Sequence, residues 1–416
     1  MSDLRGLSAA PEIDAGRVIA DLRELAKRTS DEHGAQRLCW TDTWLEARAF
    51  LRELLAEIGI EAERDEAGNV WGRLEGSDPG AKALAVGSHS DSVPDGGWLD
   101  GALGVMTAVG VLRAYAGAKP QRPIVLVDWA DEEGARFGYS LFGSSAFAGE
   151  LDPEAVSRLR DPGGQTMREV LAEHEVDVRR APECAARRDG LAAYLELHIE
   201  QGPVLEAEGV TVAAVEGCQG IERVRFLFEG QAGHAGTTPM AMRRDAGLAA
   251  AKCATSVSSL PDRHGGVATS GELRLEPGIS TAVAGAAHLT CDLRNPDADA
   301  LAEMLEDARE AARAAADAQR CVVSEEQIFR IAPTTFDAKL VADARSAGEE
   351  ETGTGFSITS GALHDAAQVA RVMPAAMMFC PSRGGLSHAH EEDTSEDDLA
   401  TAIAAFGRLA GKALGL

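Results

Sequence analysis

The sequence predicts an α/β protein in which a domain built on a largely parallel β-sheet is interrupted by an inserted α+β domain. Short apolar runs alternate with amphipathic helical patterns before residue 215 and after residue 331, which is typical of a parallel sheet covered by helices. Between those two points the pattern changes to alternating strands with two long helices. We therefore expect one domain over 1–214 and 332–416 and a second domain over 215–331.

Helices and strands alternate through the first half of the chain. Apolar residues at three- and four-residue spacing indicate the helices, and continuous apolar runs such as PIVLVDW indicate buried strands. The expected elements are helices over 17–28 and 43–58, two short strands within 61–74, a strand over 83–87, a helix over 101–116, and strands over 123–129 and 192–198. A mostly helical segment over 140–188 separates the last two strands.

The second half contains the insert and then returns to the first pattern. In the insert, the expected elements are strands over 222–229, 266–275 and 286–293, helices over 243–260 and 297–315, and a closing run over 321–331. After the insert they are helices over 339–350 and 361–369, a strand over 375–380 and a helix over 395–414. The last helix opens with a Ser-x-x-Asp cap.

The chain carries a formal net charge of −27 over 416 residues. This excess of acidic groups argues against electrostatic binding to nucleic acid or to an anionic membrane. Hydrophobic residues at 45% and charged residues at 26% are typical of a globular protein. The first 22 residues include acidic side chains and no long apolar stretch, which indicates neither a secretory signal nor a transmembrane helix. We expect a cytoplasmic enzyme.

Seven cysteines are scattered along the chain without a Cys-x-x-Cys pair. An odd number in this arrangement indicates neither a disulfide framework nor a zinc ribbon. We expect buried free thiols, because free cysteine behaves as a small hydrophobic residue.

Five polar side chains stand in or beside Gly- or Ser-containing loops, and the first four of them come at or soon after an expected buried strand. They are His89, Asp100, Glu133, His198 and His388. Ligands of a parallel sheet gather beyond the carboxyl ends of its strands, and histidine with carboxylate suits a borderline cation such as zinc. Any one of these residues alone is more often a polar turn residue. Their joint placement favours a metal site at one edge of the sheet.

Five motifs, in order along the chain, carry a resemblance to a known family. They read GSHSDSVPDGGWLDGALGV, DEEGARFG, LELHIEQGPVLE, GHAGTTPM and SHAHEEDTS. From about residue 17 to the C-terminus, the chain resembles the N-carbamoyl-L-amino acid hydrolase and allantoate amidohydrolase family. That family belongs to the dinuclear metallohydrolases, together with aminoacylase- and carboxypeptidase G-like enzymes. The resemblance implies a metallopeptidase-like catalytic domain, an inserted lid and dimerisation domain, and two divalent metal ions per subunit: zinc, or else manganese, cobalt or nickel.

The resemblance also implies a place for each metal ligand. Asp100, at the WLDG position, would bridge the two ions. His89 and His198 would complete the ligands of one ion, and Glu133 and His388 those of the other.

Three further residues would serve catalysis. Asp91 would accept a hydrogen bond from the imidazole of His89 and fix its tautomer. Glu132 matches the general base that takes a proton from water and delivers it to the leaving nitrogen. His234, in GHAGTTPM, would polarise the scissile carbonyl as an oxyanion donor does. The ordinary alternatives are a turn acceptor for Asp91, a loop carboxylate for Glu132 and a solvated surface histidine for His234.

The substrate side of the site is implied by the same motifs. Arg294, in CDLRNPD, would hold the substrate carboxylate with its planar guanidinium, and a surface arginine at a strand end is the alternative. The remaining family-like contacts are Gln201, His364, Gly384 and Gly385, the two glycines through their backbone N–H groups. Thr281 is a further candidate substrate contact, because it stands where the family commonly has an asparagine whose amide pairs with substrate. This departure bears on specificity, as does Leu363 in place of the second glycine of GAGHDA.

The implied function is hydrolysis of the ureido C–N bond of an N-carbamoyl L-amino acid or a related ureido acid, with allantoate and β-ureidopropionate as alternative substrates. An aminoacylase or dipeptidase is a second hypothesis, which His198 disfavours because peptidase-type relatives more often have an acidic ligand there. A non-catalytic metabolite-binding relative is a third, disfavoured by the intact ligand positions. We expect a small-molecule substrate, a homodimer formed through the lid, and neither nucleic acid nor membrane as a partner.

Overall fold

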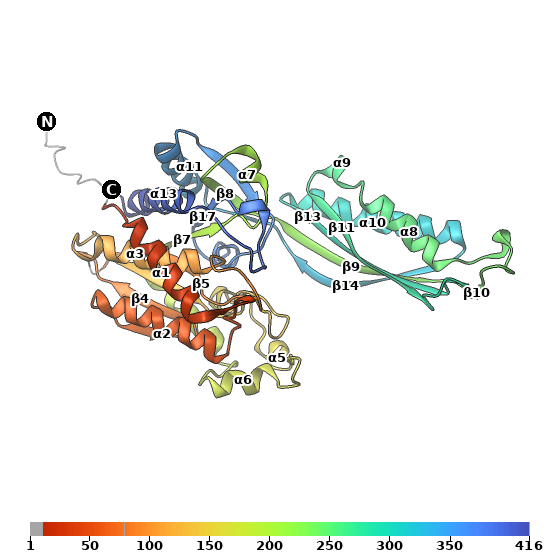
Figure 1. Ribbon diagram of the computed structural model, residues 1–416, viewed down its shortest axis with the longest axis horizontal. Coiled ribbons are helices and arrows are strands. Elements are labelled where there is room, and N and C mark those ends of the chain that lie inside the picture. The colour runs from red at the N-terminus through yellow and green to blue at the C-terminus, as the bar shows by residue number, and fades with distance from the viewer. Residues whose placement is uncertain (1–10, 79, 416) are drawn as a thin grey trace. The chain divides into compact units, whose positions relative to one another are not determined.

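Each of two units carries its own sheet and core in the computed structural model, which describes residues 11–78 and 80–415 (Figure 1). The first unit runs to Gly217 and resumes at Thr335, and the second spans Cys218–Thr334. The second unit starts at 218 rather than the expected 215, and ends at 334 rather than the expected 331. Residues 1–10, on which the expectation about a secretory signal partly rests, lie outside the described residues. The helices of the described residues all fall short of the length and apolar character that a membrane span requires.

The first unit is built on a nine-stranded mixed sheet. In spatial order its strands are β15 (Thr334–Thr335), β8 (Ala213–Cys218), β17 (Ala375–Cys380), β7 (Leu191–Ile199), β5 (Ala83–His89), β6 (Ile124–Trp129), β4 (Val70–Leu74) and β3 (Ala62–Arg64), and β16 (Phe356–Ser360) pairs with β8. The central strands β17, β7, β5 and β6 run parallel, whereas β8, β4 and β3 pair antiparallel with their neighbours. Every residue of β5, β6 and β17 is buried, as in parallel strands that are covered on both faces.

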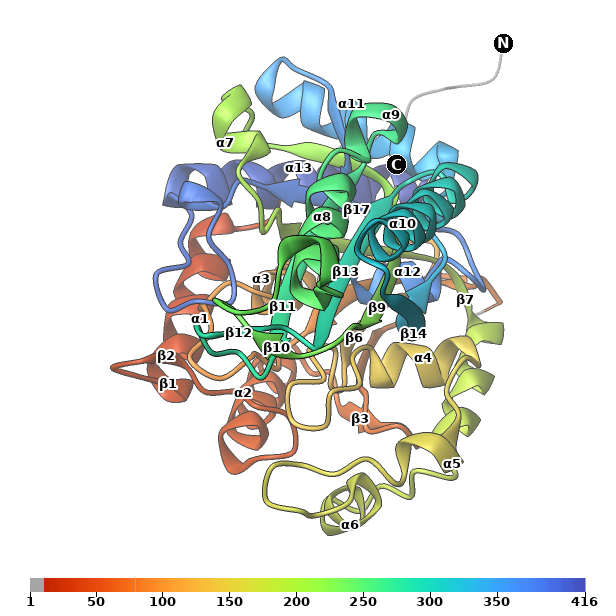
Figure 2. The ribbon, with the colours of Figure 1, turned by 90° about the vertical axis from the view of Figure 1, so that its right-hand side faces the viewer.

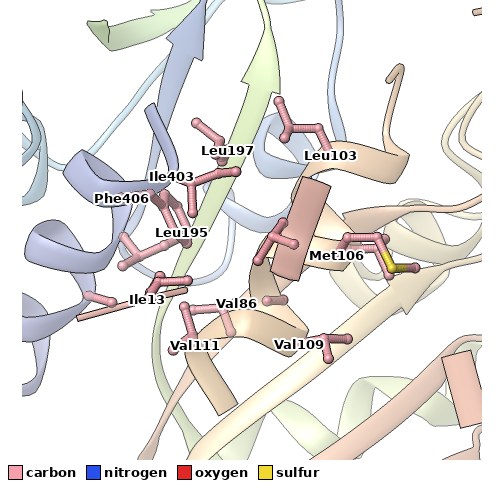
Figure 3. Packing of buried hydrophobic residues seen from close by; sticks show 14 of the residues in the cluster. Ile13, Val86, Leu103, Met106, Val109, Val111, Leu195, Leu197, Ile403 and Phe406 are labelled. Atoms are coloured by element: carbon pink, nitrogen blue, oxygen red, sulfur yellow. The ribbon is translucent and has the colours of Figure 1, made fainter. Parts of the chain in front are cut away.

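Helices cover both faces of this sheet. One face packs against α1 (Ala15–Thr29), α2 (Asp42–Glu57), α3 (Ala102–Ala116), α11 (Ala338–Thr352) and α13 (Glu396–Leu414). Their apolar side chains share one core with alternate strand residues, for example Leu195 and Leu197 of β7 with Phe406 of α13 (Figure 3). Glu196, between those two leucines, points to the other face, where it accepts the N–H of Ala366 in α12 (Asp365–Val369). Successive side chains of β7 therefore point to opposite faces of the sheet, apolar ones to the first face and Glu196 to the other.

The shorter elements of the first unit lie around this framework. They are α4 (Phe142–Ala148), which packs beside α12, α5 (Pro153–Val156), α6 (Met167–Glu173), α7 (Val204–Glu208), the 3₁₀ segments Ala181–Gly190 and Arg383–Gly385, and the ribbon of β1 (Ser30–Asp31) and β2 (Gly34–Ala35). All seven cysteines of the chain are free and buried, as the sequence predicts.

The second unit has an antiparallel sheet with helices on one face. Its strands lie in the order β11 (Val267–Glu276), β13 (Ala286–Asn295), β9 (Gly220–Glu229) and β14 (Val322–Ile331). Helices α8 (Ala246–Val257) and α10 (Ala298–Gln319) lie side by side against it (Figure 2). The smaller elements are α9 (Pro261–His264), the 3₁₀ segment Met240–Met242, and a ribbon of β10 (Gly233–His234) and β12 (Ala282–Val283). Buried and half-buried residues alternate along β13, so that its buried side chains meet the helices.

Two parts of the expected element pattern differ from the structure. The helix expected over 361–369 is shorter, and strand β16, which the sequence does not predict, precedes it. Four of the five residues of β16 are only half-buried, so no continuous apolar run marks the strand. By contrast, Ser395 caps α13 as predicted, because its side-chain oxygen accepts the N–H of Asp398.

Candidate metal centre

Five side chains converge at the carboxyl ends of the central strands. β5 ends at His89, β7 carries His198 one residue before its end, Glu133 follows β6 and His388 follows β17. Asp100 lies in the loop between β5 and α3. Because neighbouring parallel strands end at the same edge of a sheet, the strand order β17, β7, β5, β6 brings these residues together.

These side chains form two groups, each of which could hold a metal ion, and Asp100 belongs to both. In the first group, Oδ1 of Asp100 lies 3.2 Å from Nε2 of His198 and 3.7 Å from Nε2 of His89. In the second group, Nε2 of His388 lies 3.3 Å from Oδ2 of Asp100 and 3.4 Å from Oε2 of Glu133. The two carboxylate oxygens of Asp100 therefore face different groups.

The donor atoms of both groups fit divalent cations. Two ligands that bind a tetrahedral zinc ion at about 2.0–2.1 Å are about 3.3 Å apart, which is close to the distances between donor atoms in both groups. Imidazole nitrogen and carboxylate oxygen suit zinc and other borderline ions. The side chains of both groups are thus of the types that commonly bind zinc.

Negative charge is crowded at this site. Burial, followed by repulsion from Asp100, raises the pKa of Glu133 to about 7. Burial also raises the pKa of Glu132 well above its usual range. Burial acts on Asp100 in the same direction, but hydrogen bonds with His198 and His388 hold its pKa well below the usual range. Carboxylates packed this closely favour bound cations, and cation binding to such a site releases protons.

The turn that follows Asp100 requires a glycine. Gly101 has a φ of 64°, a conformation that L side chains rarely adopt. A Cβ atom at this position would lie 2.4 Å from Cε1 of His89. Gly101 also donates its N–H to Nε2 of His198 at 3.2 Å. The glycine of the WLDG motif thus lets the backbone bring Asp100 against both histidines.

Asp91 connects His89 to the loop that carries Glu132 and Glu133. Its Oδ1 lies 3.6 Å from Nδ1 of His89, and that nitrogen is also 3.2 Å from the Asp91 carbonyl oxygen. The carboxylate accepts the N–H groups of Glu132 at 3.4 Å and of Glu133 at 3.2 Å. The orienting role predicted for Asp91 requires a carboxylate beside the ring of His89, and the same carboxylate also holds the loop after β6.

The adjacent acids Asp131 and Glu132 point in different directions. Oε2 of Glu132 lies 3.9 Å from Nε2 of His89, at the first metal-binding group. Asp131 is completely buried and accepts a hydrogen bond from Nε1 of Trp40 at 3.0 Å. Glu132 retains 8% exposure, whereas Asp131 has none.

Comparison with known proteins identifies the family. Residues 85–412 match the peptidase family M20/M25/M40. The chain belongs to this family. It is 36% identical to an N-carbamoyl-L-amino-acid amidohydrolase of Rhizobium meliloti, over 92% of this chain and 93% of that protein. It is 31% identical to an allantoate amidohydrolase of Bacillus subtilis (strain 168), over 91% of this chain and 92% of that protein.

A solved structure agrees with this assignment. The crystal structure of an amidase of the hydantoinase/carbamoylase family from Burkholderia multivorans matches with a TM-score of 0.88 at 34% identity, covering 96% of this chain and 97% of that one. These comparisons confirm the predicted family resemblance and the predicted fold class. The M20 family is metal-dependent, in agreement with the two metal-binding groups.

Two residues predicted to contact substrate lie beside the metal-binding groups of this M20 family member. Nε2 of Gln201 donates to Oδ2 of Asp100 at 3.0 Å. His364 is buried, and its ring centre lies 4.5 Å from that of His198. Burial holds the pKa of His364 well below its usual range, which favours the neutral form of this imidazole. Both residues therefore lie beside the metal-binding groups.

The backbone N–H groups of Gly384 and Gly385 are engaged within the first unit. Gly384 donates to Oε2 of Glu206 at 2.8 Å, and Gly385 donates to the carbonyl oxygen of Ser382 at 2.9 Å. A substrate carboxylate would have to displace these acceptors. The sequence pattern gives no sign of the acceptor Glu206, because it lies 178 residues away from Gly384.

Three further predicted site residues belong to the second unit: the catalytic candidate His234 and the substrate-binding candidates Thr281 and Arg294. The loops of His234 and Thr281 meet, since the carbonyl oxygen of Thr281 accepts the N–H of Ala235 at 2.8 Å. Nε of Arg294 donates to Oδ1 of Asp292 at 2.7 Å. The second unit thus brings His234 and Thr281 together and holds Arg294 through an acid two residues before it.

Sequence reasoning misses two buried charged residues at the metal centre, Arg37 and Glu392. Nε of Arg37 donates to the carbonyl oxygen of Ser90 at 2.8 Å. Glu392 accepts the backbone N–H of Asp100 at 3.0 Å. Glu392 stands four residues after His388 in the SHAHEEDTS motif, and this position could have singled it out. No local pattern marks Arg37, because its partner Ser90 is 53 residues away in the sequence.

A buried ion pair supports the ends of β5 and β6. Nε of Arg48 lies 2.9 Å from Oδ2 of Asp128, and both side chains are buried. The same oxygen of Asp128 accepts the hydroxyl of Ser90 at 3.0 Å. Arg48 also donates to the carbonyl oxygens of Asp128 and Trp129 at 3.2 and 3.3 Å. The pair therefore links α2 to the two strands that lead into the metal centre.

We expect Arg48→Ala to destabilise the first unit by about 3–5 kcal/mol, because the Asp128 carboxylate would remain buried without its partner. All five tryptophans lie between residues 40 and 129, so urea unfolding followed by tryptophan fluorescence reports on the first unit. Arg52→Ala removes an exposed arginine from the next turn of α2 and should cost less than about 0.5 kcal/mol. Equal unfolding midpoints for the two variants would contradict the proposed support.

Proposed function

We propose that this chain hydrolyses the ureido C–N bond of an N-carbamoyl L-amino acid or a related ureido acid. The observation that carries the proposal is the pair of metal-binding groups that share Asp100, with Glu132 beside them. Relatives named as amidohydrolases of N-carbamoyl-L-amino acids and of allantoate support it, because they match 92% and 91% of the chain. Allantoate and β-ureidopropionate are the alternative ureido substrates.

We assign two divalent cations to the metal centre. His89 and His198 would hold one cation, Glu133 and His388 the other, and Asp100 would bind both. Zinc, manganese, cobalt and nickel all suit these donors. When bound, such ions polarise a carbonyl oxygen and lower the pKa of water.

Glu132 is the residue that moves the proton. It takes a proton from the water whose oxygen bonds to the ureido carbonyl carbon. When the C–N bond to the amino acid breaks, Glu132 gives that proton to the departing nitrogen. The products are the free amino acid and carbamic acid, which decomposes to carbon dioxide and ammonia. The 3.9 Å between Glu132 and His89 supports this role, because it places the carboxylate beside the first metal-binding group.

Hydrogen bonds around His234 support its role as a donor to the scissile carbonyl. The N–H groups of Gly236 and Thr237 donate to its Nδ1 at 3.1 and 3.3 Å. A neutral imidazole whose Nδ1 accepts a hydrogen bond carries its hydrogen on Nε2. His234 thus has an N–H donor at Nε2, and stabilising a developing oxyanion requires such a donor. It would act in the active site of its own subunit or of a partner subunit.

We assign recognition of the substrate carboxylate to Arg294. One oxygen of Asp292 accepts Nε of Arg294 at 2.7 Å, and the other accepts Nη2 of Arg223 at 2.6 Å. Asp292 is fixed from both sides and in turn fixes the direction of the Arg294 guanidinium. A fixed direction supports the assignment, because bidentate binding of a carboxylate depends on it.

Arg294→Ala should raise KM for ureido acids about 10- to 100-fold and change kcat less, since a charged hydrogen bond contributes about 1.5–3 kcal/mol. Steady-state kinetics with an N-carbamoyl amino acid, and with the same compound lacking its carboxylate, measure the effect. Arg225→Ala removes another arginine from the neighbouring strand β9 and serves as the control. An unchanged KM in Arg294→Ala would remove this residue from carboxylate binding.

We further propose a cytoplasmic homodimer that forms through the second unit, as in the family that the sequence resembles. The edge strands of its sheet support this assembly. β11 carries exposed Val267 and Leu273, and β14 carries exposed Val322 and Phe329. Edge strands with exposed apolar side chains can pair with another chain.

Release of ammonia and of new primary amine across a panel of compounds tests the proposed function, because amide substrates yield an amine without ammonia. The panel contains N-carbamoyl L-amino acids, allantoate, β-ureidopropionate, N-acetyl amino acids and dipeptides, each assayed with several metals added to chelated enzyme. Ureides should be hydrolysed, and the preferred ureide identifies the substrate. Turnover of N-acetyl amino acids or dipeptides alone would establish the aminoacylase or dipeptidase alternative. Protein that is inert toward every compound would favour a metabolite-binding role.

A further inference from the structure

Glu392 joins two loops of the metal centre. Its Oε1 accepts the backbone N–H groups of Leu99 at 3.1 Å and of Asp100 at 3.0 Å. Its Oε2 accepts the hydroxyl of Ser387 at 2.8 Å. Asp100 lies in the loop after β5, and Ser387 lies in the loop after β17. One carboxylate therefore holds both the backbone of the shared ligand and the residue next to His388.

The loop of Asp100 is shaped to admit this carboxylate. Glu392 is only 2% exposed. A Cβ atom at Gly97 would lie 2.0 Å from Oε1 of Glu392, so a side chain at that position would push the carboxylate away. A buried carboxylate is unfavourable unless it is hydrogen-bonded, and the donors from the two loops meet this requirement. The close fit indicates that the position of Glu392 is defined by both loops.

The hydroxyl of Ser387 has one hydrogen and two carboxylates within reach. Oε2 of Glu392 is 2.8 Å away, and Oδ2 of Asp100 is 3.3 Å away. The hydrogen bond to the closer acceptor, Glu392, is the stronger one. The Ser387 oxygen then accepts a hydrogen bond from Nε2 of Gln201 at 3.2 Å. Through this hydroxyl, Glu392 links the loop of His388 to the loop of Asp100.

We propose that Glu392 is a positioning residue for the second metal-binding group, formed by Asp100, Glu133 and His388. It fixes the loop of Asp100 and, through the hydroxyl of Ser387, ties the loop of His388 to it, so that Oδ2 of Asp100 and His388 meet one cation together. The first group faces Oδ1 of Asp100 and should depend on Glu392 less. This inference rests on the metal assignment made under the proposed function.

Glu392→Gln tests the inference while keeping the shape of the side chain. An amide cannot accept hydrogen bonds at both ends, so the Ser387 hydroxyl loses its acceptor and the link between the two loops is broken. We expect the second zinc ion to bind about 10- to 100-fold more weakly and the first zinc ion to bind as in the wild type. The measurement is a titration of chelated full-length protein with Zn²⁺ against a chromophoric competitor, which resolves the two binding steps.

Two further variants complete the experiment. Glu391→Gln changes the exposed neighbouring acid, which pairs with His390, and should leave both steps unchanged. Ser387→Ala keeps the backbone hydrogen bonds of Glu392 but removes its bond to the loop of His388, and should weaken only the second step. Tryptophan fluorescence confirms the fold of each variant, and Ser387→Ala gives the decisive result if Glu392→Gln does not fold.

The outcomes separate this inference from the proposed function. A selective loss in the second step supports the inference. Two unchanged steps, or equal losses in both steps, overturn it while leaving the metal assignment in place. Fewer than two zinc ions bound by the wild-type protein would overturn the metal assignment, and the positioning role with it.

Discussion

Replacing Glu132 with glutamine is expected to lower kcat at least about a hundredfold while both metal ions stay bound. The amide keeps the size of the side chain but cannot take a proton from water or return it to the leaving nitrogen. Glu132 is not a member of either metal-binding group, so the ligand set should survive the substitution. Metal content and steady-state kinetics, measured on the same preparation, separate loss of catalysis from loss of metal.

The neighbouring acid makes this prediction specific. Asp131 bonds to Trp40, so Glu132 and not Asp131 is the proposed base. Full metal occupancy together with normal turnover in Glu132→Gln would show that another group moves the proton. Loss of metal in this variant would instead place Glu132 among the ligands.

Asp100→Ala should abolish binding of both metal ions, because each group loses one of its three donors and the groups lose the carboxylate they share. Asp91→Ala should weaken binding by about 10- to 100-fold without abolishing it, the usual effect of removing a residue that orients a metal ligand. Asp91 is 3.6 Å from Nδ1 of His89 and holds the N–H groups of Glu132 and Glu133. Metal content after dialysis and zinc affinity distinguish the two variants.

The two variants serve as controls for each other, since both remove a buried aspartate of the same motif. Equal losses of metal would mean that bridging and orienting roles are wrongly divided between Asp100 and Asp91. Retention of one firmly bound ion in Asp100→Ala would contradict the shared carboxylate.

Much of the first unit could be predicted because its central strands are fully buried. β5 and β6 appear in the sequence as continuous apolar runs, and the polar residues at their ends stand out against that background. Since parallel strands present their carboxyl ends at one edge, the positions of His89, Glu133 and His198 follow from the strand pattern. The bridging role of Asp100 is implied by the family resemblance. The structure adds that its two carboxylate oxygens face different metal-binding groups.

Other features depend on contacts that local sequence does not encode. Arg48 and Arg37 are buried against partners that lie far along the chain, whereas arginine in a helix or loop usually indicates an exposed side chain. The N–H group of Gly384 meets Glu206 only in the folded chain. The two hydrogen bonds to Nδ1 of His234 depend on the backbone conformation of the turn that follows it. The residues of the GHAGTTPM motif do not by themselves predict that conformation.

The most direct test of the proposed function is the ratio of ammonia to free amino acid released from an N-carbamoyl L-amino acid as metal returns to chelated enzyme. Cleavage of a ureido C–N bond should yield equal amounts of both products, with no turnover in the metal-free protein. Turnover without metal, or release of amino acid without ammonia, would contradict metal-dependent hydrolysis of a ureide by this chain.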